Sequence, residues 1–311
     1  MQVWRAAELV HEKLRIRSNC FDYSGQVIKS RVIVCIDDDP WSAVWASWLF
    51  HKMLGQGSAP VVLCVGGQGL LSRHTDNKEL KAELEKMLGQ KIGIFTEARR
   101  LQYVCLSLGV FPRNLYVLDK GTNTGANIGE IAEFLAVHPE VSESITFALT
   151  PRLSLRFERS FKFQIQEAMR KACAKIGQTV ADDFRLPEDR YFVGGQALSN
   201  ACSWANGKKC CNGEMMLHEL ASILDRCDRY AGKFQLPLEQ PVDEETRKAA
   251  ALLASRYRIK LGKMGIREIL QYLRLFVSLK KHQREMVEEL KQIIKMKRRE
   301  FEKEFGICFI R

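Results

Sequence analysis

The chain lacks any apolar run long enough to cross a membrane, because no stretch approaches the ~20 consecutive apolar residues that a spanning helix needs. Residues 1–18 alternate apolar and charged side chains and so lack the continuous apolar segment of a secretory signal. Internal repeats and low-complexity stretches are missing as well. From these absences we expect a cytoplasmic protein without a transmembrane segment.

Paired CxxC motifs are also missing, although the chain contains 10 cysteines. Several cysteines lie inside apolar runs, where a disulfide partner is hard to supply, and this favours reduced thiols. A second group offers soft ligands for zinc, but at intervals that match neither a zinc ribbon nor a zinc finger. Its members are Cys202, Cys210, Cys211, His218 and Cys227. We therefore expect free thiols and no bound metal.

Acidic residues are scarce only near the C-terminal end. The chain has 48 Lys and Arg residues against 37 Asp and Glu residues, a formal charge of +11. Residues 1–246 carry 30 basic and 30 acidic side chains, whereas residues 247–311 carry 18 and 7. The main body is thus neutral, and it gives no reason to expect a nucleic-acid partner.

Apolar segments that end in polar or glycine-containing loops alternate with helical patterns along most of the chain. The strands expected from this pattern are residues 31–36, 60–65, 114–118 and 145–149, with a fifth near 178–181. Strands that are apolar throughout are buried on both faces, and their alternation with helices requires crossover connections. We therefore expect an α/β fold, a three-layer Rossmann-like sandwich with a mainly parallel sheet.

The pattern divides the chain into three expected segments. Residues 1–185 would form the Rossmann-like domain with an N-terminal helix, residues 186–262 a helical cap or subdomain, and residues 263–311 a C-terminal extension of basic helices. The last helix, expected at 279–305, carries an apolar stripe between basic residues. Such a helix docks on its own domain or on a second subunit, which would make the protein a homo-oligomer.

Gly66, Gly67 and Gln68 follow the second expected strand directly. Glycines allow a sharp turn there, and such a turn exposes backbone N–H groups that can hold a carboxylate or a phosphate. The segment is neither a GxGxxG motif nor a Walker loop with its lysine. Because glycine turns are common at strand ends, this one does not by itself define a ligand site.

Glu97 opens a helix immediately after Thr96. In the simpler interpretation Thr96 caps the helix and Glu97 complements the positive helix end. In the functional interpretation Glu97 accepts hydrogen bonds from the hydroxyls or the amine of a ligand, or acts as a general base. Both interpretations stay open from the sequence.

The segment from Gly121 to Glu130, GTNTGANIGE, joins the third strand to the next helix with short polar side chains. One interpretation is an extended N-cap of that helix. However, Asn127 lies one turn inside the helix, where no cap is needed and asparagine has poor helix propensity. We therefore expect Thr122, Asn123, Thr124 and Asn127 to form a polar cluster that faces a ligand.

Asp37 and Asp38 begin the acidic stretch Asp37–Asp39 at the end of the first strand. Their oxygens suit Mg²⁺, and they equally suit a cap for the helix that starts after Pro40. We favour capping together with a ligand contact over a dedicated metal site.

These residues together carry a resemblance. The stretches TEARRLQYVCLSLGVFPRNLYVLDKGTNTGANIGEIAEFL and ITFALTPRLSLRFERSF are similar to the YdcF-like family, which includes SanA-like and ElyC-like proteins. The matching elements, across about residues 30–175, are Gly66-Gly67, Glu97, Leu108-Gly109-Val110 and Thr122–Asn127. The order of these elements and the distances between them make the likeness more specific than any single motif.

The resemblance implies a Rossmann-like domain with a C-terminal extension and, for the YdcF type, binding of S-adenosylmethionine. The chain departs from the family by Asp37–Asp39 where members have Val/Leu-Gly-Gly. It also lacks the histidine of the following motif, where Pro151, Arg152 and Arg156 stand, and either arginine could be the family's. SanA-like and ElyC-like proteins are membrane-anchored, and without such an anchor this chain is closer to the soluble YdcF type.

Three functions are therefore expected in turn. The first is binding of S-adenosylmethionine or a similar nucleotide-like ligand at the carboxyl ends of the strands. The second is a hydrolase or transferase that acts on a phosphorylated or lipid-linked substrate, with Glu97 as base and Arg152 or Arg156 on the phosphate. The third is an interaction protein that works through its basic C-terminal helix.

Overall fold

The structure, a computed structural model, describes residues 3–14, 18–36, 40–68, 77–177, 187–194, 243–256 and 283–309. The chain divides into two compact units. The larger unit contains residues 17–150, 164–194 and 287–311, and the smaller unit contains residues 1–16, 151–163 and 195–286. The expected boundaries at residues 185 and 262 stay predictions, because the residues next to them lie outside the described ranges.

The larger unit is built on a five-stranded sheet in which all strand pairs are parallel, in the order β3-β2-β1-β4-β5. Its first four strands lie within one residue of the expected positions, which confirms the expected parallel α/β fold. They are β1 (Val32–Ile36), β2 (Val61–Val65), β3 (Leu115–Leu118) and β4 (Ser144–Leu149). All of β1 is buried, as are the last four residues of β2 and the last five of β4.

The fifth strand, β5 (Glu188–Val193), lies in a segment that was expected to be irregular. The expected strand near residues 178–181 falls outside the described residues. β5 pairs with β4 alone and forms the edge of the sheet, so its sequence, EDRYFV, mixes charged and apolar residues. Its buried Arg190 donates hydrogen bonds to the Lys29 carbonyl and the Ser30 hydroxyl, both at 3.1 Å, and pairs with Glu188.

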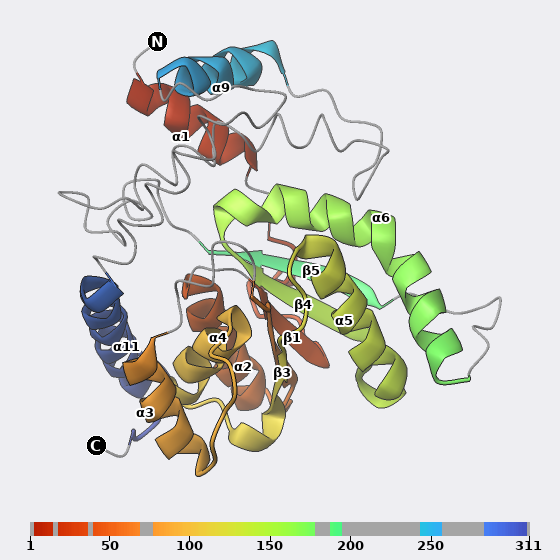
Figure 1. The fold of residues 1–311 in the computed structure, drawn as a ribbon, viewed down its shortest axis with the longest axis vertical. Coiled ribbons are helices and arrows are strands. Elements are labelled where there is room, and N and C mark those ends of the chain that lie inside the picture. Colours follow the sequence, from red (N-terminus) through yellow and green to blue (C-terminus); the bar gives the residue numbers. More distant parts are fainter. Residues whose placement is uncertain are drawn as a thin grey trace. The chain divides into compact units, whose positions relative to one another are not determined.

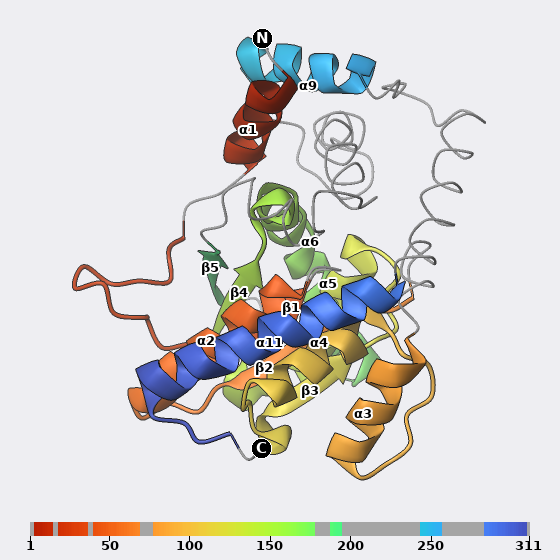
Figure 2. The ribbon, with the colours of Figure 1, turned by 90° about the vertical axis from the view of Figure 1, so that its left-hand side faces the viewer.

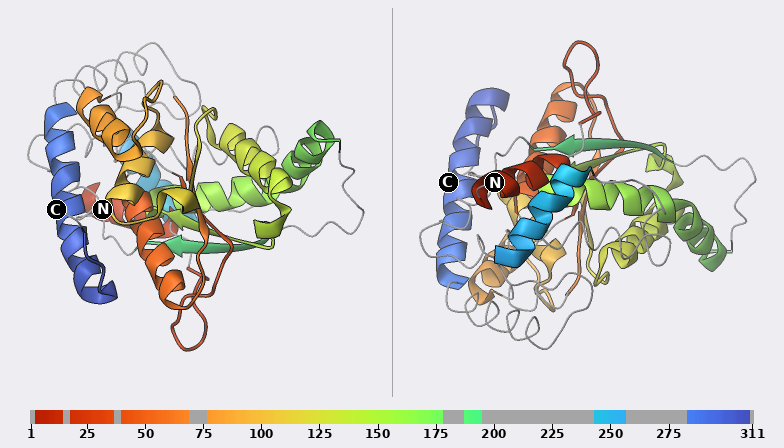
Figure 3. Two further views of the ribbon diagram at one scale, coloured as in Figure 1. Left: turned by 90° about the horizontal axis from the view of Figure 1, so that it is seen from below. Right: turned by 90° about the horizontal axis from the view of Figure 1, so that it is seen from above.

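Helices cover both faces of this sheet and make three layers (Figures 1 and 3). One face carries α2 (Trp41–Gly55) and α4 (Glu97–Ser107), with α3 (Lys78–Leu88) beside α4. The other face carries α5 (Thr124–Val137) and the second half of α6 (Pro151–Lys175). The strand order places the reversal of chain direction along the sheet between β1 and β4.

The C-terminal helix α11 (Gln283–Phe305) adds a further layer outside α2 and α4 (Figure 2). Its apolar stripe is buried, and its members are Val287, Leu290, Ile293, Ile294 and Phe301. Phe301 and Phe305 lie 5.6 and 5.4 Å from the ring of His51 on α2. The expectation that this helix docks on its own domain is therefore confirmed.

The positive charge of α11 meets acidic groups of the same unit. Lys291 pairs with Glu79 and, at 2.7 Å, with Glu83, both on α3. In the other direction, Glu304 of α11 accepts from Trp48 Nε1 at 3.2 Å and pairs with Lys52 at 2.7 Å. Part of the C-terminal excess of basic residues is thus compensated within one chain.

In the smaller unit, α1 (Val3–Leu14) packs against α9 (Glu244–Arg256). The contact is made by small apolar side chains, including Ala6 and Ala7 on one helix and Ala249 and Ala250 on the other. An ion pair of 3.0 Å joins Lys13 to Asp243, which precedes α9. Among the described residues, no helix is long and apolar enough to cross a membrane.

His51 supplies a test of how α11 is attached. The residue is buried, its Nε2 donates to the Leu108 carbonyl at 2.8 Å, and burial lowers its pKa below the ordinary value. Protonation therefore costs more in the folded than in the unfolded chain, so this stabilisation is complete above about pH 6.5 and falls as pH falls.

We expect the melting temperature of the protein to drop more between about pH 7.5 and pH 5.5 than that of His51→Gln, which keeps an N–H donor and does not titrate. Differential scanning calorimetry at several pH values measures this difference. Parallel curves for the two proteins would contradict the assignment.

Candidate functional site

The candidate site lies at the carboxyl ends of β2 and β3, where α4 and α5 begin. Of the expected site residues, Gly66, Gly67, Gln68, Glu97, Thr122, Asn123, Thr124 and Asn127 fall in this described part. Asp37 and Asp38 lie outside the described residues, as do the side chains of Pro151 and Arg152. Arg156 lies on the part of α6 that belongs to the smaller unit.

Gly66 brings the end of β2 against the first turn of α4. Its φ of +140° is one that side-chain-bearing residues rarely adopt, and a Cβ there would lie 2.8 Å from Glu97 Oε2. The Gly66 carbonyl accepts the N–H of Ala98 at 2.8 Å, which fixes the start of the helix. The half-buried Glu97 is therefore held against the strand end by backbone contacts on both sides.

Gly67 makes the second close approach, to the loop after β3. A Cβ at Gly67 would lie 2.6 Å from the Gly121 carbonyl oxygen and 2.7 Å from the Asp119 carbonyl oxygen. The N–H groups of Gly66 and Gly67 donate to the carbonyls of Leu118 and Gly121 at 2.9 and 2.7 Å. The expectation that these two groups are open to an anion is therefore wrong, because β3 and its loop take both of them.

Glu130, to which the sequence gave no role, organises the same loop from the second turn of α5. Its two carboxylate oxygens accept the N–H groups of Lys120 at 3.0 Å and Gly121 at 2.9 Å. Burial raises its pKa, and Asp119 adds to the rise, while the two N–H donors oppose it. The only sequence signal was a glutamate on α5 within reach of two consecutive amides before that helix.

The polar segment at the start of α5 serves in part as a helix cap. Asn123 is the N-cap, and its side chain accepts the Ala126 N–H at 3.0 Å. Thr122 is exposed and Thr124, the first helical residue, is half-buried. Likewise Thr96 caps α4 through a bond of 3.3 Å from the Arg99 N–H. The capping interpretation is thus confirmed at both helices.

Asn127 differs from these caps. It is 8% exposed, and its Oδ1 is buried with no hydrogen-bond partner among the described residues. The same Oδ1 would lie 2.0 Å from a Cβ on Gly121, so it stands directly beside the loop that Glu130 organises. A buried acceptor without a donor costs about 1–3 kcal/mol.

The charges around these groups are mostly negative. Glu97, Asp119 and Glu130 all lie at this end of the sheet, and the Arg99 guanidinium is engaged with Asp119 at 3.4 Å and with Gln102 at 3.0 Å. The described groups therefore offer hydrogen-bond acceptors rather than an anion-binding cradle. They suit a ligand that brings hydroxyl or amine donors, or a positive charge.

The fold and this site define a parallel α/β protein with polar acceptors at the strand carboxyl ends. Comparisons with models of protein families, with curated proteins and with solved structures found no match for the chain. The expected soft-ligand group, from Cys202 to Cys227, lies outside the described residues, so the structure does not bear on it.

Gly121 offers a test of the close packing at this site. We expect Gly121→Ala to lower the free energy of unfolding by about 1–3 kcal/mol, because its Cβ would collide with Asn127. Gly129→Ala is the matched control, since a Cβ there meets nothing within 4 Å and alanine favours the helix. Urea unfolding of both variants measures the difference, and equal stabilities would contradict the packing described.

Proposed function

We propose that the chain binds a small nucleotide-like ligand at the carboxyl ends of β2 and β3, and that this ligand is S-adenosylmethionine or a close analogue. The observation that carries the proposal is the buried, unpartnered Oδ1 of Asn127 beside Glu97 and the glycine contacts. A donor from a ligand would remove the cost of that acceptor. The resemblance to the YdcF-like family supports the same ligand.

The chemistry of the ligand fits the chemistry of these groups. Its ribose hydroxyls and α-amine are donors, and Glu97 and Asn127 are acceptors. Its sulfonium is positive, and the local carboxylates lower the energy of a cation. Glu97 also stands at the N-terminus of α4, where the helix favours the ionised carboxylate.

The alternative functions have less support from the described residues. A phosphorylated substrate would face Glu97, Asp119 and Glu130, and would find the amides of Gly66 and Gly67 already bonded. An interaction protein that works through the apolar stripe of its last helix would need that stripe exposed, whereas α11 buries it in its own unit. Binding of a donor-rich, cationic ligand is therefore the proposal we put forward.

Calorimetric titration with S-adenosylmethionine tests the proposal. We expect binding by the unaltered chain, and about a 10- to 100-fold weaker affinity for Glu97→Gln, because a charge-assisted hydrogen bond contributes about 1.5–3 kcal/mol. Glu143→Gln is the control, since Glu143 is an exposed carboxylate that precedes β4 at the opposite end of the sheet.

No heat at about millimolar ligand, with an unchanged melting temperature, would sink the proposal. Inorganic phosphate serves as the competing probe. Binding of phosphate in place of S-adenosylmethionine would favour the phosphorylated-substrate function instead.

Asn127→Ala separates a ligand contact from a structural role. In the free protein we expect this variant to melt at a higher temperature, because it removes a buried unpaired acceptor and alanine is the better helix former. With ligand we expect a weaker affinity than that of the unaltered chain. A loss of stability without ligand, or an unchanged affinity, would count against the role given to Asn127.

A further inference from the structure

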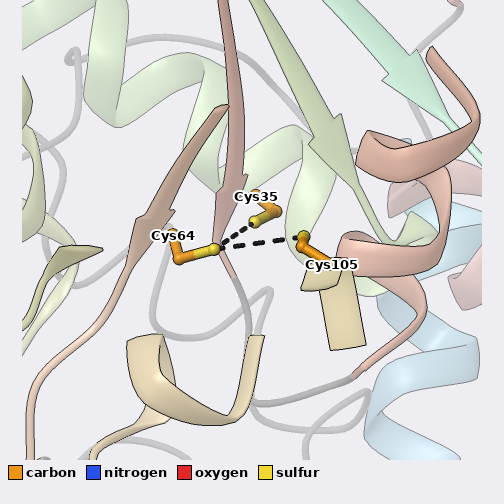
Figure 4. A group of neighbouring side chains, drawn as sticks. All are labelled: Cys35, Cys64 and Cys105. Atoms are coloured by element: carbon orange, nitrogen blue, oxygen red, sulfur yellow. Dashed lines mark hydrogen bonds between the residues drawn. The ribbon is translucent and has the colours of Figure 1, made fainter. Parts of the chain in front are cut away.

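Three cysteines from three different elements converge between the sheet and its α2/α4 layer (Figure 4). Cys35 lies on β1, Cys64 on β2 and Cys105 on α4. The three sulfur atoms all lie within 4.8 Å of one another. The Cys35 Sγ to Cys64 Sγ distance is 3.5 Å, and the Cys64 Sγ to Cys105 Sγ distance is 4.0 Å.

The convergence follows from the fold. Cys35 and Cys64 are register partners in neighbouring parallel strands, so their side chains leave the same face of the sheet. Cys105 meets them from the helix that packs on that face. All three residues are 0% exposed, whereas the equally buried Cys20 belongs to no such group among the described residues.

We propose that Cys35, Cys64 and Cys105 form a binding site for one thiophilic d¹⁰ metal ion, of the class of Zn²⁺ and Cu⁺. Soft thiolate ligands select these ions over Mg²⁺ and Ca²⁺. The proposal departs from the metal-free protein expected from the sequence, and it is independent of the ligand proposed for the strand ends.

The distances suit such an ion with little movement. A metal about 2.3 Å from three sulfurs separates the sulfurs by roughly 3.8 Å in a tetrahedral site and roughly 4.0 Å in a trigonal one. The observed 3.5 and 4.0 Å bracket these values. Among the described residues, no further His, Cys, Asp or Glu joins the group within 4.8 Å, which favours a three-sulfur site.

Loading the site releases three protons, one from each thiol, because thiolates are the ligands. Burial raises the pKa of the Cys35 and Cys64 thiols, so without metal they are neutral and pack as small apolar side chains. The positive ion offsets the thiolate charge in the core. Binding therefore strengthens as pH rises, and a buried site takes up its ion as the chain folds.

The test uses the full chain with Cys202→Ser, Cys210→Ser, Cys211→Ser and Cys227→Ser, so that thiols outside the described residues do not contribute. This protein is refolded under reducing conditions with Cd²⁺, Zn²⁺ or Cu⁺ alone, and excess metal is removed with a chelator. We expect one retained ion per chain, with thiolate-to-Cd²⁺ charge-transfer absorption. Competition between Zn²⁺ and Cu⁺ then identifies the preferred ion.

Cys105→Ala in this background should lose the ion, and the matched control Cys20→Ala should keep it. Absence of bound metal in the background, or retention by Cys105→Ala, would overturn the proposal. If Cys105→Ala does not fold, X-ray absorption of the zinc-loaded background decides the matter. Three sulfur scatterers at about 2.3 Å support the site, and a shell of nitrogen and oxygen overturns it.

Discussion

The close approach of backbone to backbone at the ends of β2 and β3 is the constraint on which the candidate site depends. Gly66 admits the first turn of α4, Gly67 admits the loop after β3, and Gly121 admits Asn127. A Cβ at any of the three would lie 2.8 Å or less from another atom. Two helix starts and two strand ends are thereby fixed around one point, with Glu130 holding the loop.

Much of the sheet could be predicted from the sequence, because strands buried on both faces are apolar along their length. β5 could not, since an edge strand carries charge and the partners of Arg190 lie about 160 positions earlier in the chain. Such a pairing depends on tertiary structure, and no local pattern carries it. The expected strand was consequently sought too early, near residue 178.

At the site, the sequence identified the residue types and their neighbourhood but not their bonding. Glycines after a strand predict a sharp turn, yet whether their amides face a ligand or another strand end depends on the loop beside them. Asn123 and Asn127 have the same side chain, and one caps a helix while the other is buried without a partner. For the thiol group, Cys35 and Cys64 take the same place in two similar strands, a signal that was visible, whereas the contribution of Cys105 depends on how α4 packs.

The attachment of α11 has a consequence for the order of folding. Trp48 and Glu304 are in contact although 256 positions separate them, and His51 meets Phe301 and Phe305 across a similar interval. Closing so long a loop is entropically costly and slow compared with forming neighbouring β-α units. During synthesis, the outer surface of α2 and α4 therefore stays uncovered until residue 305 has left the ribosome. The nascent chain must keep this aromatic surface from aggregating for nearly the whole of its translation.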